Sequence, residues 1–256
     1  MSIAIKFENV DKSFADHAFL TGGLKNYVLN GFKAAQYDRN HKVLEDITFE
    51  IPHGSTAGFI GRNGAGKSTL LGLIAGVMRP NAGRITVDGR VSSLLELGAG
   101  FHPDLSGREN IELYGVVLGF SRREIRKRLD QIVDFAELEE HIDVPIRFYS
   151  SGMMARLGFA VVSQLDPEIL LVDEVLGVGD YRFQAKCAEV MKRFRTDGGT
   201  VVLVSHSAGD IINLCDRAYF IENHRIVASG DPKEVMAKYQ PEPTPVPPPV
   251  VETPAA

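Results

Sequence analysis

A chain of 256 residues with 44% hydrophobic and 24% charged residues has the composition of a soluble globular protein, long enough for one sizeable core or a core with a subsidiary lobe. The formal net charge of −5 argues against a broad basic surface, so we expect no nucleic-acid partner. No stretch approaches about 18 consecutive apolar residues, so we expect any membrane role to depend on a partner protein.

The N-terminal region predicts strands of a mixed sheet. Alternating apolar residues over 3–10 indicate a half-buried strand that ends near 11–14, and alternation resumes over 43–51. Between them, residues 15–42 form either a short, glycine-broken helix with one apolar side or a flexible loop. Further on, two strand residues precede Asp88-Gly89, which is a strong turn signal for a hairpin.

The nonapeptide GRNGAGKST at 61–69 fits the pattern G-x-x-x-x-G-K-[ST]. A buried strand is expected to end just before it, and apolar residues follow it at helical spacing, namely Leu70, Leu71, Leu73, Ile74 and Val77. Glycines let the backbone bring successive N–H groups close to anionic oxygens, and the helix N-terminus adds its dipole. The segment therefore predicts a cradle for nucleotide phosphates.

Side chains in this cradle supply the remaining charge. Lys67 would place its ammonium group on the β- and γ-phosphates, and the hydroxyl of Ser68 would coordinate magnesium. The contacts with the nucleotide that we expect from the cradle come from Gly61, Asn63, Gly64, Ala65, Gly66, Lys67, Ser68 and Thr69.

Residues 106–165 have helical character and indicate a lobe inserted into the α/β core. Ser106 to Glu109 and Ser121 to Glu124 both fit capping boxes. A basic run at 122–128 indicates either a solvated helix face or a partner-binding surface.

The core resumes with an apolar strand at 169–172 that ends in two carboxylates. Asp173 suits coordination of magnesium, and Glu174 could act as the general base that polarises the attacking water. His206 follows a second apolar strand, at the sheet edge where ligands bind, and could bond the γ-phosphate or serve only a structural role.

The C-terminal part predicts a hairpin around Asn223-His224. Cys187 and Cys215 stand in apolar patterns without metal-ligand spacing, so we expect small core residues. Residues 241–256 are rich in proline and predict an extended, mostly disordered tail that serves as a spacer or as a ligand for a proline-binding groove.

The order of these motifs resembles that of the nucleotide-binding subunits of ABC transporters, over roughly residues 3–235. Residues 61–69 resemble the Walker A motif, 169–174 Walker B, 177–180 the D-loop and His206 the switch histidine. The resemblance implies an α/β P-loop NTPase core of ABC type, with an antiparallel β subdomain and an inserted helical lobe at about 106–165. It implies one ATP-binding domain, which we place at 1–240, ahead of the tail that the proline-rich composition predicts at 241–256.

Tyr149-Ser150-Ser151-Gly152-Met153 stands where the family usually has the signature LSGGQ. This variant resembles that of ATP-binding subunits of bacterial polysaccharide exporters, for O-antigen, capsule or teichoic acid, as do residues 95–103 and the insertion between Phe14 and Val43. The Q-loop glutamine is missing, with Glu96 the nearest polar substitute. The family's adenine-stacking aromatic falls at Phe14, with Tyr27 and Tyr37 as competitors.

The resemblance also implies a mechanism and partners. Ser150 and the N–H of Gly152 would bind the γ-phosphate held by a second copy, and Asp180 would complete the nucleotide site, so that a head-to-tail homodimer encloses two ATP molecules with Mg2+. An integral membrane permease subunit would hold the dimer at the cytoplasmic face of the bacterial inner membrane.

Under this resemblance the protein would drive export of a lipid-linked polysaccharide. The catalytic motifs do not encode cargo, so another ABC transporter, such as an importer or drug exporter, remains an alternative. A second alternative is a non-transport ABC-type ATPase that acts as an assembly or mechanical factor.

Overall fold

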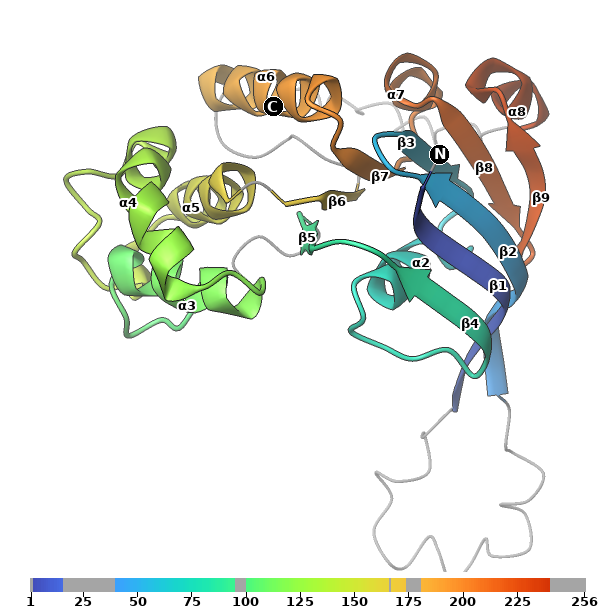
Figure 1. Ribbon diagram of the computed structural model, residues 1–256, viewed down its shortest axis with the longest axis horizontal. Coiled ribbons are helices and arrows are strands. Elements are labelled where there is room, and N and C mark those ends of the chain that lie inside the picture. Colours follow the sequence, from blue (N-terminus) through green and yellow to red (C-terminus); the bar gives the residue numbers. More distant parts are fainter. Residues whose placement is uncertain (1, 16–39, 95–99, 166, 174–180, 240–256) are drawn as a thin grey trace, which may run out of the picture.

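The computed structural model describes residues 2–15, 40–94, 100–165, 167–173 and 181–239. Within these ranges the chain forms two β-sheets with helices beside them, and a further group of helices within residues 107–164 lies to one side of the sheets in Figure 1. The arrangement confirms the predicted α/β class with an antiparallel β subdomain.

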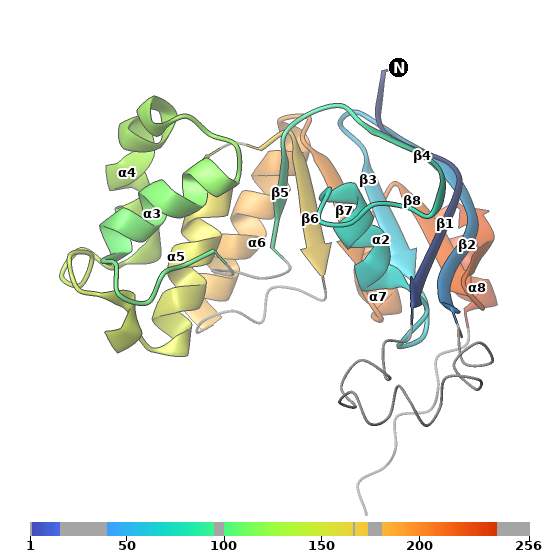
Figure 2. The same cartoon turned by 90° about the horizontal axis from the view of Figure 1, so that it is seen from below.

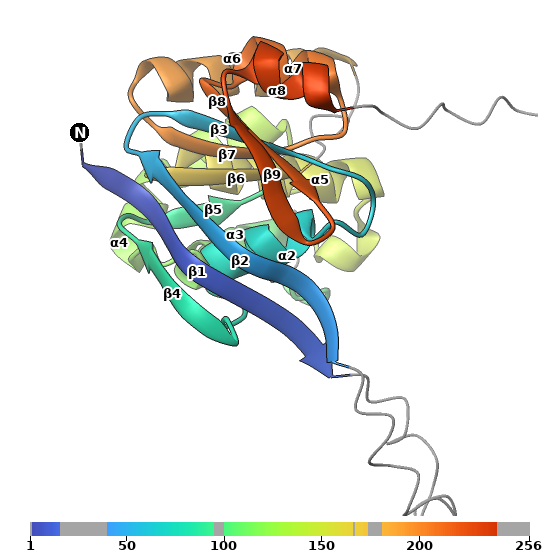
Figure 3. The ribbon, with the colours of Figure 1, turned by 90° about the vertical axis from the view of Figure 1, so that its right-hand side faces the viewer.

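The smaller sheet is antiparallel and has the order β2-β1-β4. Its strands are β1 (Ile3–Ala15), β2 (Asn40–Pro52) and β4 (Ala82–Val87). Phe7 in β1 pairs with Phe49 in β2, and their stacked ring centroids lie 4.5 Å apart. Figure 3 shows these three strands crossing in front of the larger sheet.

The larger sheet has the order β5-β6-β7-β3-β8-β9, in which all neighbours are parallel except β8 and β9. Its strands are β3 (Thr56–Ile60), β5 (Val91–Ser93), β6 (Ile169–Asp173), β7 (Thr200–Val204), β8 (Arg217–Glu222) and β9 (Arg225–Gly230). Every residue of β3 and β7 is buried, as expected for parallel strands covered on both faces. The carboxyl ends of β3, β6 and β7 therefore meet at one edge.

The helices of the described ranges include α2 (Lys67–Ile74), α3 (Gly107–Val117), α4 (Arg122–Ala136), the 3-10 turn η2 (Ile146–Phe148), α5 (Ser151–Gln164), α6 (Tyr181–Thr196), α7 (Ala208–Leu214) and α8 (Pro232–Lys238). Both predicted capping boxes are present, at the N-termini of α3 and α4. Figure 2 again shows α3, α4 and α5 together, apart from α2.

Two hydrophobic cores hold these layers together. One lies between the two sheets and α2, where Phe59 stacks on Tyr219 at 4.8 Å and contacts Phe49 edge-on at 5.1 Å. The other joins the opposite face of the larger sheet to α5 and α6 and continues into α3 and α4. Cys187 and Cys215 are buried in this second core, as predicted.

The hairpin predicted at Asp88-Gly89 is wrong. β4 pairs with β1 in the smaller sheet, whereas β5 pairs with β6 in the larger one, so the turn carries the chain from one sheet to the other. Only Gly89 of the pair has a positive φ, at 125°, and the N–H of Asp88 donates to the carbonyl of Ala4. A two-residue hairpin of type I′ requires positive φ at both central residues.

The predicted hairpin at Asn223-His224 is confirmed, since both residues have positive φ, 48° and 69°, and connect β8 to β9. Val77 does not continue the apolar face of α2. The helix ends at Ile74, Gly76 follows with φ 72°, and Val77 is 80% exposed.

Candidate active site

The phosphate loop runs from the buried end of β3 into α2 through two glycines with left-handed backbones. Gly64 has φ 80° and Gly66, the N-cap of α2, has φ 102°. A Cβ atom on Gly66 would lie 2.6 Å from the carbonyl oxygen of Val43 and 2.6 Å from Cδ2 of Leu44. The loop can therefore pass this close to β2 only with glycine at position 66.

Lys67 begins α2 and is only 7% exposed. Its Nζ atom donates to the carbonyl oxygens of Gly61, at 2.8 Å, and Arg62, at 3.1 Å. These bonds hold the ammonium group inside the loop, where the sequence pattern requires a cation for the phosphates.

Ser68 and Asp173 come together from distant parts of the chain. Asp173 is the last residue of β6, and its Oδ2 atom lies 3.5 Å from Oγ of Ser68. Hydroxyl and carboxylate oxygens suit Mg2+, which is usually bound by one or two side chains together with phosphates and water. Among the described residues, no cluster of three or more histidine, cysteine, aspartate or glutamate side chains could hold a metal ion. Binding of Mg2+ through one or two side chains does not require such a cluster.

A cavity of about 520 Å³ lies over the loop. Besides the loop and Asp173, its wall includes two residues of β2, His41 and Val43. His41 was not among the predicted site residues, because no local pattern connects it to a loop 20 residues further along the chain. The complete lining consists of His41, Val43, Asn63, Gly64, Gly66, Lys67, Ser68, Thr69 and Asp173.

Phe14 lies opposite His41 in the pairing of β1 with β2 and is 42% exposed. Nζ of Lys12 lies 4.9 Å from the centre of its ring. The cavity lining includes His41 but not Phe14. Tyr27 and Tyr37, which compete with Phe14 as the adenine-stacking residue, lie outside the described residues.

His206 follows β7 on a turn that neighbouring side chains hold in place. The N–H of Ser207 donates to Oγ of Ser205 at 2.9 Å, and Oγ of Ser205 donates to Oδ2 of Asp210 at 3.2 Å. Val204, the last residue of β7, is in register with Asp173. The exposed side chain of His206 thus belongs to the same sheet edge as Asp173 and the phosphate loop.

Ser150 is the N-cap of α5, and its Oγ atom accepts a bond from the N–H of Met153 at 3.2 Å. Gly152 lies in the first turn of this helix, where backbone N–H groups have no intrahelical partner. Among the described residues, none from the helical lobe lines the cavity over the phosphate loop. The structure therefore does not bring Ser150 and Gly152 to Lys67 of the same chain.

Three predicted site residues lie outside the described ranges, namely Glu174, Asp180 and the Q-loop substitute Glu96.

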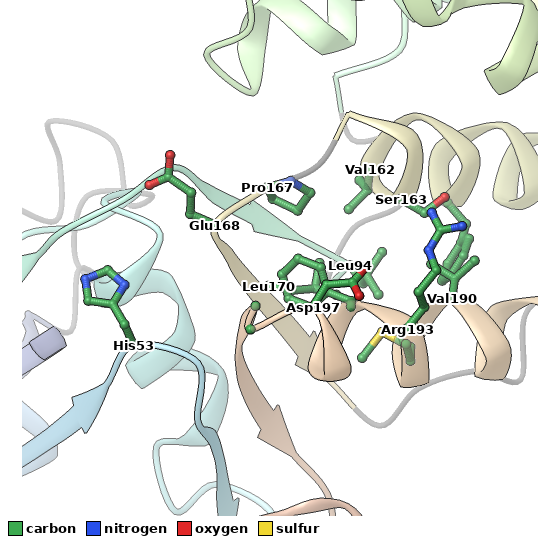
Figure 4. Close-up of a pocket in the computed structure, with 15 residues that line it drawn as sticks. His53, Leu94, Val162, Ser163, Pro167, Glu168, Leu170, Val190, Arg193 and Asp197 are labelled. Atoms are coloured by element: carbon green, nitrogen blue, oxygen red, sulfur yellow. The ribbon is translucent and has the colours of Figure 1, made fainter. Parts of the chain in front are cut away.

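Figure 4 shows a second cavity, of about 680 Å³, which shares no residue with the first. It lies between α5, α6 and the start of β6, and is lined in part by Pro167, Leu170 and Arg193. Because β6 begins here and ends at Asp173, this second cavity is remote from the predicted chemistry.

The chain resembles known proteins both in sequence and in fold. The family model described as ABC transporter matches residues 44–177. The O-antigen export system ATP-binding protein RfbB of Klebsiella pneumoniae is 48% identical over 242 residues, which cover 94% of this chain and 98% of that protein.

Two further matches extend this result. The teichoic acids export ATP-binding protein TagH of Bacillus cereus is 37% identical, and the match covers 94% of this chain but 43% of TagH. A dimeric structure of a post-hydrolysis state of an ATP-binding cassette, bound to ADP and Pi, has a TM-score of 0.68 at 21% identity, covering 89% of this chain and 98% of that one. At that identity the structural match shows a shared fold.

Proposed function

Because this chain belongs to the ABC transporter family, we propose that it is the ATP-hydrolysing subunit of an exporter that moves a lipid-linked polysaccharide across the cytoplasmic membrane. The observation that carries the proposal is the similarity to an O-antigen export ATP-binding protein over nearly the whole length of both chains. We assign residues 1–240 to the ATP-binding domain, with the helical lobe at about 106–165 inside it.

Phosphoryl transfer depends mainly on positioning and charge neutralisation, and the residues of the cavity supply both. Lys67, held by two carbonyl oxygens, can transfer its hydrogen bonds to phosphate oxygens when ATP enters. Ser68 and Asp173 present oxygen atoms 3.5 Å apart that fit Mg2+, with Asp173 acting through a water molecule, and the ion neutralises charge on the phosphates when bound. We assign the general base to Glu174 and the contact with the γ-phosphate to His206.

The signature turn acts on a second copy in this proposal. Ser150 and the backbone N–H groups in the first turn of α5 form an anion-binding helix terminus. Since no described residue of the lobe lines the chain's own cavity, a γ-phosphate bound to this turn would belong to a partner chain. Two copies related by a two-fold axis then complete each other's sites, with Asp180 at the same interface.

We assign the path through the membrane to a partner protein. Within the described residues, no helix is long and apolar enough to cross a membrane. We propose that an integral membrane permease holds the homodimer at the cytoplasmic face of the inner membrane. ATP binding closes the dimer and hydrolysis releases it, which shifts the permease between its states.

The test combines purification with a cellular readout. We expect the chain to copurify with one polytopic membrane protein, and cells that carry K67A or E174Q to lose the exported polysaccharide from their surface. K233A, which removes an exposed lysine outside the lining of the cavity, is the matched control and retains export. Hydrolysis that survives K67A, or a soluble partner in place of the membrane protein, contradicts the proposal.

A further inference from the structure

Phe148 is an exposed aromatic residue beside the signature turn. It ends the 3-10 turn η2 and is 67% exposed, whereas its neighbours Ile146 and Tyr149 are buried. Burial of a large apolar side chain is favourable by about 1.5–3 kcal/mol relative to exposure. The ring of Phe148, exposed beside the signature turn, is therefore available for a contact with another molecule.

The turn that carries Phe148 is held from several sides. The hydroxyl of Tyr149 donates to the carbonyl of His141 at 2.7 Å, and the N–H of Arg147 donates to the carbonyl of Pro103 at 3.0 Å. The guanidinium of Arg147 pairs with Asp104 at 2.7 Å and lies 5.0 Å from the centre of the Phe148 ring. The ring is thus presented outward on a fixed backbone, with one face against Arg147.

The position of this ring relates it to the nucleotide of a second copy. Phe148 precedes Ser150 by two residues, a span of at most about 7 Å of extended chain. If Ser150 caps the γ-phosphate of a partner's ATP, Phe148 lies within reach of the ribose and base of that same nucleotide. An aromatic ring offers no charge to phosphates, but its face can stack on any base.

We propose that Phe148 packs on the base of the ATP bound in the partner's cradle, so that each subunit contributes an aromatic contact in trans. The inference rests on the proposed head-to-tail homodimer and adds a base-binding residue to it. Arg147 serves as a positioning residue that steadies the ring. Because stacking does not read the edge of the base, the contact raises affinity for ATP and GTP alike.

The first experiment measures nucleotide affinity of the full-length protein in an E174Q background, which keeps the closed dimer from hydrolysing ATP. We expect F148A to weaken binding of ATP and of GTP by about tenfold, and F148W to restore it. V117A, which truncates another exposed apolar residue of the lobe, is the matched control and leaves affinity unchanged. Equal thermal melting temperatures of all variants exclude misfolding.

A mixed dimer tests whether the contact is made in trans. One chain carries K67A and keeps Phe148, and the other carries F148A and keeps its phosphate loop. The one cradle able to bind is then that of the F148A chain, and its partner supplies the ring. Wild-type affinity at this site supports the proposal, whereas the weak affinity of the F148A homodimer overturns it, because the ring would then act within its own chain.

Two further outcomes separate the failure of this inference from that of the proposed function. If the E174Q protein does not dimerise with ATP, the head-to-tail dimer itself is wrong. If it dimerises and F148A binds nucleotide as tightly as the parent, the dimer stands and the role of Phe148 is overturned. Loss of association with the membrane protein by F148A, at unchanged nucleotide affinity, likewise overturns it in favour of a permease contact.

Discussion

Oγ of Ser68 lies 3.5 Å from Oδ2 of Asp173, although 105 residues separate the two in sequence. Ser68 stands in the first turn of α2, and Asp173 ends β6, which is separated from β3 by β7. The parallel order of these strands places the turn after β3 and the end of β6 at the same edge of the sheet. The two oxygen atoms of the proposed magnesium site are therefore brought together by the topology and not by closeness in sequence.

The first prediction concerns this pair. S68A removes a hydroxyl oxygen, and D173N removes the negative charge of a carboxylate. We therefore expect the rate of hydrolysis to fall by about 100-fold in each variant and the magnesium concentration for half-maximal activity to rise. Steady-state ATPase measurements over a magnesium titration test this expectation. D88N removes an exposed carboxylate that pairs with His53 and should leave the magnesium response unchanged. If the magnesium titration is unaltered in both the Ser68 and the Asp173 variants, the proposal that these two residues bind magnesium is wrong.

The second prediction concerns Gly66. Alanine at this position would adopt a backbone conformation that costs about 1–3 kcal/mol, and its Cβ atom would also meet the carbonyl oxygen of Val43. We expect G66A to lose most of its affinity for ATP, as measured by equilibrium binding. G76A is the matched control, since Gly76 has φ 72° but open space around it. The same loss of affinity in G76A would show that backbone strain and not the cradle is responsible.

A third prediction distinguishes the two rings near the cavity. His41 lines the cavity and Phe14 does not, so H41A should weaken ATP binding more than F14A does, by up to about tenfold. Inorganic tripolyphosphate has no base, so we expect its affinity for the loop to be the same in both variants and the parent. The hypothesis that Phe14 carries the base would be favoured by the reverse order of effects.

The fourth prediction follows from the capping box of α4. Bonds from the Ser121 hydroxyl and backbone, and then from Arg90, lower the pKa of Glu124 from 4.5 to about 2. Because the pKa of Glu124 is lower in the folded chain than in the unfolded chain, its carboxylate stabilises the fold at pH values above the unfolded pKa. This stabilisation is complete above about pH 4.5 and is lost as the pH falls toward 2. We expect S121A to raise the pKa of Glu124, measured by NMR titration, and to lower Tm by about 2–4 °C at neutral pH.

This difference in Tm should shrink as the pH falls from about 4.5 toward 2, because the unfolded chain binds a proton at Glu124 before the folded chain does. S229A, at an exposed position in β9, should melt like the parent at every pH. A difference between S121A and the parent that is constant down to pH 2 would show that the carboxylate contributes nothing.

Short-range signals in the sequence were sufficient for several elements. The glycine pattern of 61–69, the two capping boxes and the turn at Asn223-His224 depend on backbone dihedrals and on bonds between residues three or four apart. Such interactions are present in the local sequence, and the structure contains each of them. The assignment to the family likewise rested on the order of these local motifs.

Strand partners and the composition of the cavity required the tertiary structure. Asp88-Gly89 has the composition of a hairpin turn, but β4 pairs with β1 and β5 pairs with β6, and both partners are distant in sequence. For the same reason no local pattern could place His41 in the wall of the phosphate cavity or bring Ser68 to Asp173. Local sequence thus determined which turns and helix ends could form, whereas long-range pairing and burial decided which of them meet at the site.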